Sequence, residues 1–231
     1  MSRLCAASNR KTGEANSIAS NIRDFDNTIT VLVGPEEKRF SVHEDAICDK
    51  SKFFKAACRK CWIEGRERLV RLPEHKADVF QDYCKWVYSG VISTTLITPL
   101  DSVREKTAEE TRFIDLYLLG DSLDDVQLRN LATQGFCRSL EAGNSLPSPT
   151  GYATIWSSTP SGSLFRKQLV DMVLLVCGRE DIAATIAQYP PEFVQELAIA
   201  TSRKVPVVTW AAATGDNKKY LELEEPKVNT A

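Results

Sequence analysis

The chain has 231 residues, of which 43% are hydrophobic and 26% are charged. This composition is typical of a folded globular protein and excludes a disordered or fibrous chain. Its 29 basic and 31 acidic residues leave a formal charge of -2, which excludes a global electrostatic attraction to nucleic acid or to anionic membranes.

The N-terminal part of the chain predicts an arm followed by a β-hairpin. Residues 1–23 are polar without sustained periodicity, so we expect a flexible arm. Residues 28–33 alternate with period two and are rich in β-branched side chains, which predicts a strand. A Gly-Pro turn follows, and Phe40 and Val42 supply the alternation of a second strand.

Most of the remaining chain has helical periodicity. Residues 43–61 predict two short helices with a break near residues 49–51, where Ser51 is placed to cap the second helix. A short strand is expected at 69–72, ended by Pro73. The other expected segments are a helix at 78–89 capped by Gly90, a linker at 93–111, helices at 110–120, 125–140, 152–157, 164–177 and 192–200, and a flexible tail at 204–231.

Several stretches of this sequence resemble BTB/POZ domains. In the first half they are Thr30-Val31-Leu32-Val33, Phe40-Ser41-Val42-His43, Ser51-Lys52-Phe53-Phe54, Val70-Arg71-Leu72-Pro73-Glu74 and Trp86-Val87-Tyr88-Ser89-Gly90. The last third is similar to the helical extension of fungal BTB proteins, through Tyr152-Ala153-Thr154-Ile155-Trp156 and the segment 163–171.

The resemblance implies an α+β fold, with a BTB/POZ-like core of a short-stranded mixed sheet covered by helices, followed by an all-helical extension. The core is placed at residues 24–141 and the extension at residues 142–203. Proteins of this family present surfaces for self-association and for protein partners. We therefore expect a non-enzymatic protein-protein interaction module that self-associates through the hairpin and the first helices, with no catalytic residue, no cofactor and no small-molecule substrate.

A short triplet extends the resemblance to one class of partner. Some BTB proteins are substrate adaptors that bind a cullin ubiquitin ligase, and these carry a hydrophobic-x-Glu triplet after the helical pair. Trp62-Ile63-Glu64 stands at that place here, so Trp62 and Glu64 are candidate partner-binding residues. In the alternative interpretation, Trp62 packs against the domain and Glu64 only solvates the loop.

The sequence offers few residues for catalysis or for metal binding. Cys58 and Cys61 form a Cys-x-x-Cys pair on a predicted helix, but no second pair completes a zinc site. The only histidines are His43 and His75, neither beside a nucleophile signature, and His43 is expected to be structural at a strand-helix junction. The seven scattered cysteines favour reduced thiols in the cytoplasm or nucleus, and no segment is long and apolar enough to span a membrane.

Residues 50–71 contain eight basic residues against two glutamates. This segment suggests an alternative function as a DNA- or chromatin-associated regulator. Because Phe53 and Phe54 are expected in the core and not free to stack on bases, a solvated face or a patch for an acidic protein partner is favoured over a nucleic-acid site. Phe53 and Phe80 are both predicted to be core residues.

Overall fold

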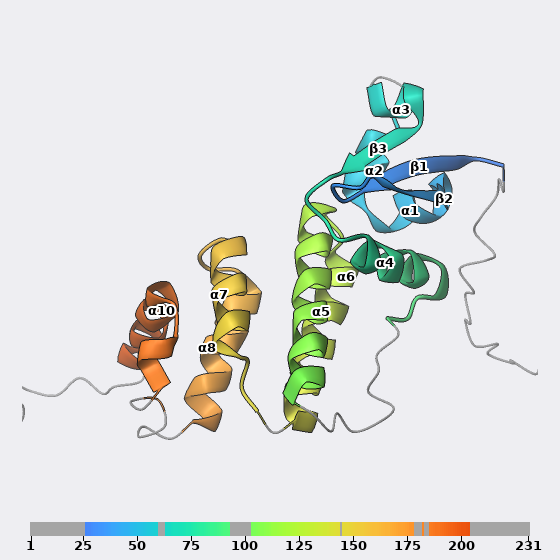
Figure 1. The fold of residues 1–231 in the computed structure, drawn as a ribbon. Coiled ribbons are helices and arrows are strands. Elements are labelled where there is room, and N and C mark those ends of the chain that lie inside the picture. Colours follow the sequence, from blue (N-terminus) through green and yellow to red (C-terminus); the bar gives the residue numbers. More distant parts are fainter. Residues whose placement is uncertain are drawn as a thin grey trace, which may run out of the picture. The chain divides into compact units, whose positions relative to one another are not determined.

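The computed structural model describes residues 26–59, 63–92, 103–143, 145–177, 182 and 185–203. The predicted arm at 1–23 and tail at 204–231 lie outside the described residues. The chain divides into two compact units, Met1–Arg166 and Lys167–Ala231, which are considered separately below. The expected α+β class is confirmed, with a small mixed sheet and many helices (Figure 1).

The sheet of the first unit has three strands in the order β2-β1-β3. Strand β1 (Thr28–Val33) pairs antiparallel with β2 (Lys38–His43) and parallel with β3 (Leu69–Leu72). The turn between β1 and β2 places Gly34 at φ +77°, a conformation that favours glycine. Because β1 is central, β2 and β3 are both edge strands of the described sheet.

Helices flank the sheet and continue into a helical layer (Figure 1). The elements of this unit are α1 (Glu44–Lys50), α2 (Lys52–Ala57), α3 (Ile63–Glu67), α4 (Ala77–Ser89), α5 (Val103–Ser122), α6 (Val126–Gly143) and α7 (Pro149–Ser158). The longest pair, α5 and α6, packs side by side, α4 contacts α5 on one flank and α7 contacts it on another. The predicted caps Ser51 and Gly90 are confirmed, the latter at φ +70°.

One hydrophobic core joins the sheet to the helices. The alternation predicted for β1 is confirmed in part, since Ile29, Val31 and Val33 are buried and Thr28 and Thr30 are half-buried, but Leu32 of the opposite face is buried as well. Across the sheet they meet buried residues of β2 and β3, and Phe54, Phe80 and Trp86 close the core from the helical side. The prediction that Phe80 is a core residue is thus confirmed. Burial of such side chains is the main favourable term in folding.

Two predictions at the sequence level need correction. Phe53 is 36% exposed and does not belong to the core, although its neighbour Phe54 is fully buried. Consecutive residues of a helix point about 100° apart, and α2 is rotated so that Phe54 faces the core while Phe53 lies toward its edge. The predicted linker also ends early, because residues 103–111 are already helical in α5. This stretch is rich in charged residues and threonine, which favoured a linker, yet two of its glutamates, Glu109 and Glu110, are buried in the structure.

The second unit consists of helical segments. It contains α8 (Leu164–Val176) from Lys167 onward, the short η2 turn (Ile186–Gln188) and α10 (Pro191–Ser202). Pro191 occupies the first turn of α10, as predicted. Within this unit the rings of Tyr189 and Phe193 lie 5.0 Å apart, and Phe193 is buried. None of the described helices of the protein is long and apolar enough to span a membrane.

Candidate interaction surface

A groove runs along the free edge of β3. Its volume is about 360 Å³. Apolar side chains of α2, acidic side chains of α3 and the strand itself form its walls. The lining residues are Phe53, Ala56, Ala57, Glu64, Glu67, Leu69, Val70 and Arg71. We call this feature the edge groove.

Helix α2 brings Phe53 to the edge groove because its N-terminus is anchored. The Ser51 hydroxyl accepts a hydrogen bond from the Phe54 amide at 3.0 Å and donates one to the Leu123 carbonyl at 2.6 Å. The Phe53 amide also donates to the Leu123 carbonyl, at 3.3 Å. These bonds fix the rotation of α2, so that Phe54 faces the core and Phe53 is presented partly to solvent.

Arg68 sets the position of α3 relative to β3. Its backbone adopts φ +54° between the two elements, a left-handed conformation that lets the chain turn sharply. The side chain is held by several acceptors at the start of the sheet. Its guanidinium donates to the Thr28 carbonyl at 3.0 Å, to Glu44 Oε2 at 3.0 Å and to the side chain of Asn27.

Gly65 allows α3 to approach the end of the preceding segment. A Cβ atom at residue 65 would lie 2.2 Å from the carbonyl oxygen of Arg59, a distance that real contacts do not reach. Glycine is therefore required for this approach of one backbone to another. Together, Gly65 and Arg68 place the acidic side of α3 beside β3.

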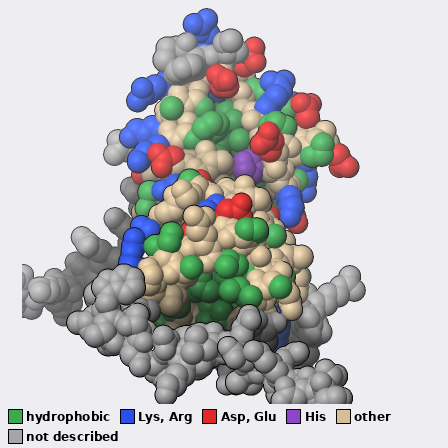
Figure 2. Space-filling model, turned by 90° about the vertical axis from the view of Figure 1, so that its left-hand side faces the viewer, with side chains coloured by type: hydrophobic (Ala, Val, Ile, Leu, Met, Phe, Trp, Pro, Cys, Tyr) green, Lys and Arg blue, Asp and Glu red, His purple; other side chains and the backbone are tan. Residues whose placement is uncertain are grey.

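The electrostatics of the edge groove are unbalanced. Glu64 and Glu67 are both exposed. Neither carboxylate forms an ion pair or a hydrogen bond within the part of the chain that the structure describes. Arg71, at the other end, is already paired with Glu37 at 3.5 Å. In Figure 2, acidic and basic side chains surround hydrophobic ones on the upper part of the molecule, which holds the sheet and α3 in Figure 1.

The predicted partner-binding residues are only partly placed. Glu64 lies on α3 in the wall of the edge groove and is solvent-exposed. Trp62 lies outside the described residues, so the choice between an exposed anchor and a packed side chain stays open. Sequence reasoning missed Phe53 and Glu67 as members of the same surface. The run Lys52-Phe53-Phe54-Lys55 held only a weak signal, because adjacent side chains on a helix point about 100° apart and the two rings need not share the same surroundings.

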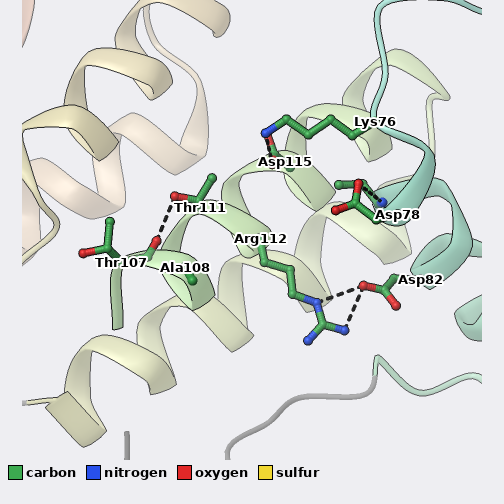
Figure 3. A pocket seen from close by; sticks show the side chains of 9 residues that line it. Lys76, Asp78, Asp82, Thr107, Ala108, Thr111, Arg112 and Asp115 are labelled. Atoms are coloured by element: carbon green, nitrogen blue, oxygen red, sulfur yellow. Dashed lines mark hydrogen bonds and ion pairs between the residues drawn. The ribbon is translucent and has the colours of Figure 1, made fainter. Parts of the chain in front are cut away.

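A second, larger groove of about 660 Å³ lies between α4 and α5 (Figure 3). Four of its five charged side chains are paired with one another, and the fifth, Asp78, accepts a hydrogen bond from the Val79 amide. Lys76 Nζ lies 2.6 Å from Asp115 Oδ2, and Arg112 Nη2 lies 2.8 Å from Asp82 Oδ2. A ligand there would have to replace these ion pairs, whereas the carboxylates of the edge groove are available without such a cost.

The histidines and cysteines have structural surroundings. His43 ends β2, and its Nδ1 lies 2.9 Å from the Tyr88 hydroxyl. His75 Nε2 lies 3.0 Å from the Ser122 hydroxyl, and burial lowers the pKa of His75. The thiol of Cys58 is hydrogen-bonded to that of Cys48, and this bond lowers the pKa of Cys58. Cys61, the other member of the Cys-x-x-Cys pair, lies outside the described residues.

The basic segment 50–71 is partly neutralised. Half of its eight basic residues form ion pairs with acidic residues, namely Lys50 with Asp49, Lys52 with Asp124, Arg68 with Glu44 and Arg71 with Glu37. Lys50 also lies over the ring of Trp86, at 5.4 Å from its centroid. These ion pairs reduce the positive charge that the segment offers to a phosphate backbone.

Comparison of the chain with models of known protein families and with curated proteins finds no match.

Proposed function

We propose that this protein is a non-enzymatic, BTB/POZ-like protein-protein interaction module and that the edge groove is one of its partner-binding surfaces. The observation that carries the proposal is the pair of exposed carboxylates, Glu64 and Glu67, beside the partly exposed ring of Phe53. An aromatic anchor flanked by charges that fix orientation is a common composition of protein interfaces.

The finer proposal is a substrate adaptor for a cullin-type ubiquitin ligase. It rests on the resemblance of Trp62-Ile63-Glu64 to the triplet of cullin-binding BTB proteins, and it is supported by the exposure of Glu64 on α3. The cullin would contact Glu64 directly. Self-association through the hairpin and the first helices belongs to the same proposal, and light scattering of the purified chain between 1 and 100 µM tests it.

A pull-down tests the proposed function. The purified chain is immobilised and exposed to extract of the host at physiological salt, and retained cullins are identified by mass spectrometry. Glu64→Lys is expected to abolish their retention. The matched control is Glu141→Lys, which makes the same charge reversal at an exposed position at the end of α6. Retention that is equal in the parent and in both variants would contradict a role for Glu64.

The alternative function, binding to DNA or chromatin, is less favoured, because four of the eight basic residues in segment 50–71 are held in ion pairs. Its test is retention on a DNA column with a salt gradient. A nucleic-acid-binding protein would elute at a salt concentration that rises with the number of phosphate contacts. We expect the chain in the flow-through.

A further inference from the structure

The backbone of β3 carries hydrogen-bonding groups that point into the edge groove. The Thr30 amide donates to the Arg68 carbonyl at 2.9 Å, and the Gly34 amide donates to the Leu72 carbonyl at 3.0 Å. In a parallel ladder, alternate residues of a strand face the same neighbour. The N–H and C=O groups of Val70 and Leu72 therefore face β1, and those of Leu69 and Arg71 face outward.

The outward groups of Leu69 and Arg71 have no backbone partner among the residues that the structure describes. The opposite edge of the sheet is paired only at its end, since the outward amides of Arg39 and Ser41 on β2 also have no backbone partner among the described residues. There the outward amide of His43, on β2, donates to the Tyr88 hydroxyl at 3.0 Å. An edge strand with unpaired backbone groups is a template for another strand.

The side chains around this edge define what an added strand must carry. Successive residues of a strand point to opposite faces of a sheet. On the face where Val70 is buried, α2 supplies Phe53 and Ala57, so side chains of the added strand on that face meet an apolar surface. Near the start of β3, Glu64 and Glu67 offer two carboxylates that have no partner among the described residues.

We propose that β3 accepts an extended peptide segment of a partner protein as a fourth strand, with apolar side chains against Phe53 and Ala57 and a lysine or arginine against Glu64 and Glu67. Main-chain hydrogen bonds to Leu69 and Arg71 hold the segment, and the apolar and basic side chains select it. The inference rests on the proposed function, because it names the kind of partner that the edge groove binds.

The test uses three labelled ten-residue peptides and the full chain, with binding followed by fluorescence polarisation. The first peptide alternates valine and lysine, the second alternates valine and glutamate, and the third repeats the first with alternate backbone nitrogens methylated. We expect the first to bind and the other two to bind at least about tenfold more weakly, since each loses either the charge complement or the main-chain bonds.

Variants of the protein assign the contacts. The double variant Glu64→Lys, Glu67→Lys should bind the valine-lysine peptide about tenfold more weakly than the parent protein does. Arg71→Pro removes the outward amide and should abolish binding, whereas Arg71→Ala keeps the amide and should preserve it. The control is Arg39→Pro on β2. Arg39 lies opposite Leu32 in the β1-β2 pair, and the N–H and C=O of Leu32 face β3. The amide of Arg39 therefore points away from β1, at the opposite edge of the sheet.

Each other outcome overturns the inference. If the methylated peptide binds as well as its parent, the main chain of β3 does not take part, and this result does not depend on the folding of any variant. If the chain forms a dimer and Arg71→Pro dissociates it, the strand added to β3 comes from a second copy of this chain and not from a partner protein. Retention of a host protein that depends on Glu64, without binding of any peptide, refutes the added strand and leaves the proposed function. If neither a host protein nor any peptide binds, both the added strand and the proposed function are refuted.

Discussion

The contrast between Phe53 and Phe54 gives the most specific prediction about how this sequence divides its side chains between the core and the edge groove. The two rings are adjacent on α2, with centroids 5.3 Å apart, yet Phe54 is fully buried and Phe53 is 36% exposed. Phe54→Ala leaves a closed cavity and should cost about 3–5 kcal/mol of unfolding free energy.

The cost of Phe53→Ala should be much smaller. Complete burial of a phenylalanine contributes about 1.5–3 kcal/mol, and Phe53 is about two thirds buried. Because the edge groove opens to solvent, truncation leaves no enclosed cavity, so we expect a loss of about 1 kcal/mol. In urea unfolding with a slope of about 2 kcal/mol per molar, the midpoint should fall by about 2 M for Phe54→Ala and about 0.5 M for Phe53→Ala.

Tryptophan fluorescence and far-UV circular dichroism report the transitions. Equal midpoint shifts for the two variants would refute the assignment of Phe53 to a surface. Although Phe53→Ala should cost less stability than Phe54→Ala, it should affect partner binding directly. We expect this variant to stay folded and to lose binding at the edge groove. A folded Phe53→Ala variant that keeps full partner binding would show that the ring is not part of the interface.

Three further predictions concern single sites. Burial lowers the folded-state pKa of His75, so the unfolded chain binds the proton more tightly and stability should fall as the pH drops below about 6.5; His75→Gln should reduce this slope, and an unchanged slope would contradict it. Iodoacetamide should alkylate native Cys58 faster than Cys48, because the hydrogen bond between the thiols lowers the pKa of Cys58 and raises that of Cys48; equal rates by peptide mapping would exclude this pairing. Ser51→Ala should cost about 2–3 kcal/mol, since it removes a helix cap and a buried bond to the Leu123 carbonyl, whereas a loss below about 0.5 kcal/mol in urea would show that neither bond matters.

Much of the fold follows from local patterns in the sequence. The alternation of Ile29, Val31 and Val33 predicted a strand, and the caps Ser51 and Gly90 marked the start of one helix and the end of another. These features depend on neighbouring residues only. They could be predicted because strand and helix periods and cap preferences act over a few positions.

The candidate site depends on contacts between distant segments, and the sequence alone does not contain that information. The edge groove exists because β3 pairs with β1 on the side away from β2, which leaves Leu69 and Arg71 with outward amides. The extension of α5 through residues 103–111 was missed for a similar reason. Glu110 is stabilised there by Ser148, whose amide and hydroxyl both donate to Oε1 at 3.0 Å from a position 38 residues away.

The measurement that tests the central claim most directly is site-specific photocrosslinking in host extract. Benzoylphenylalanine is placed at residue 53 in one sample and at residue 88 in another, because Phe53 and Tyr88 are similarly exposed, at 36% and 38%. We predict a discrete protein adduct at residue 53 that Glu64→Lys reduces, and no adduct at residue 88. Absence of an adduct at residue 53, or equal adducts at both positions, would contradict a protein-binding role for the edge groove.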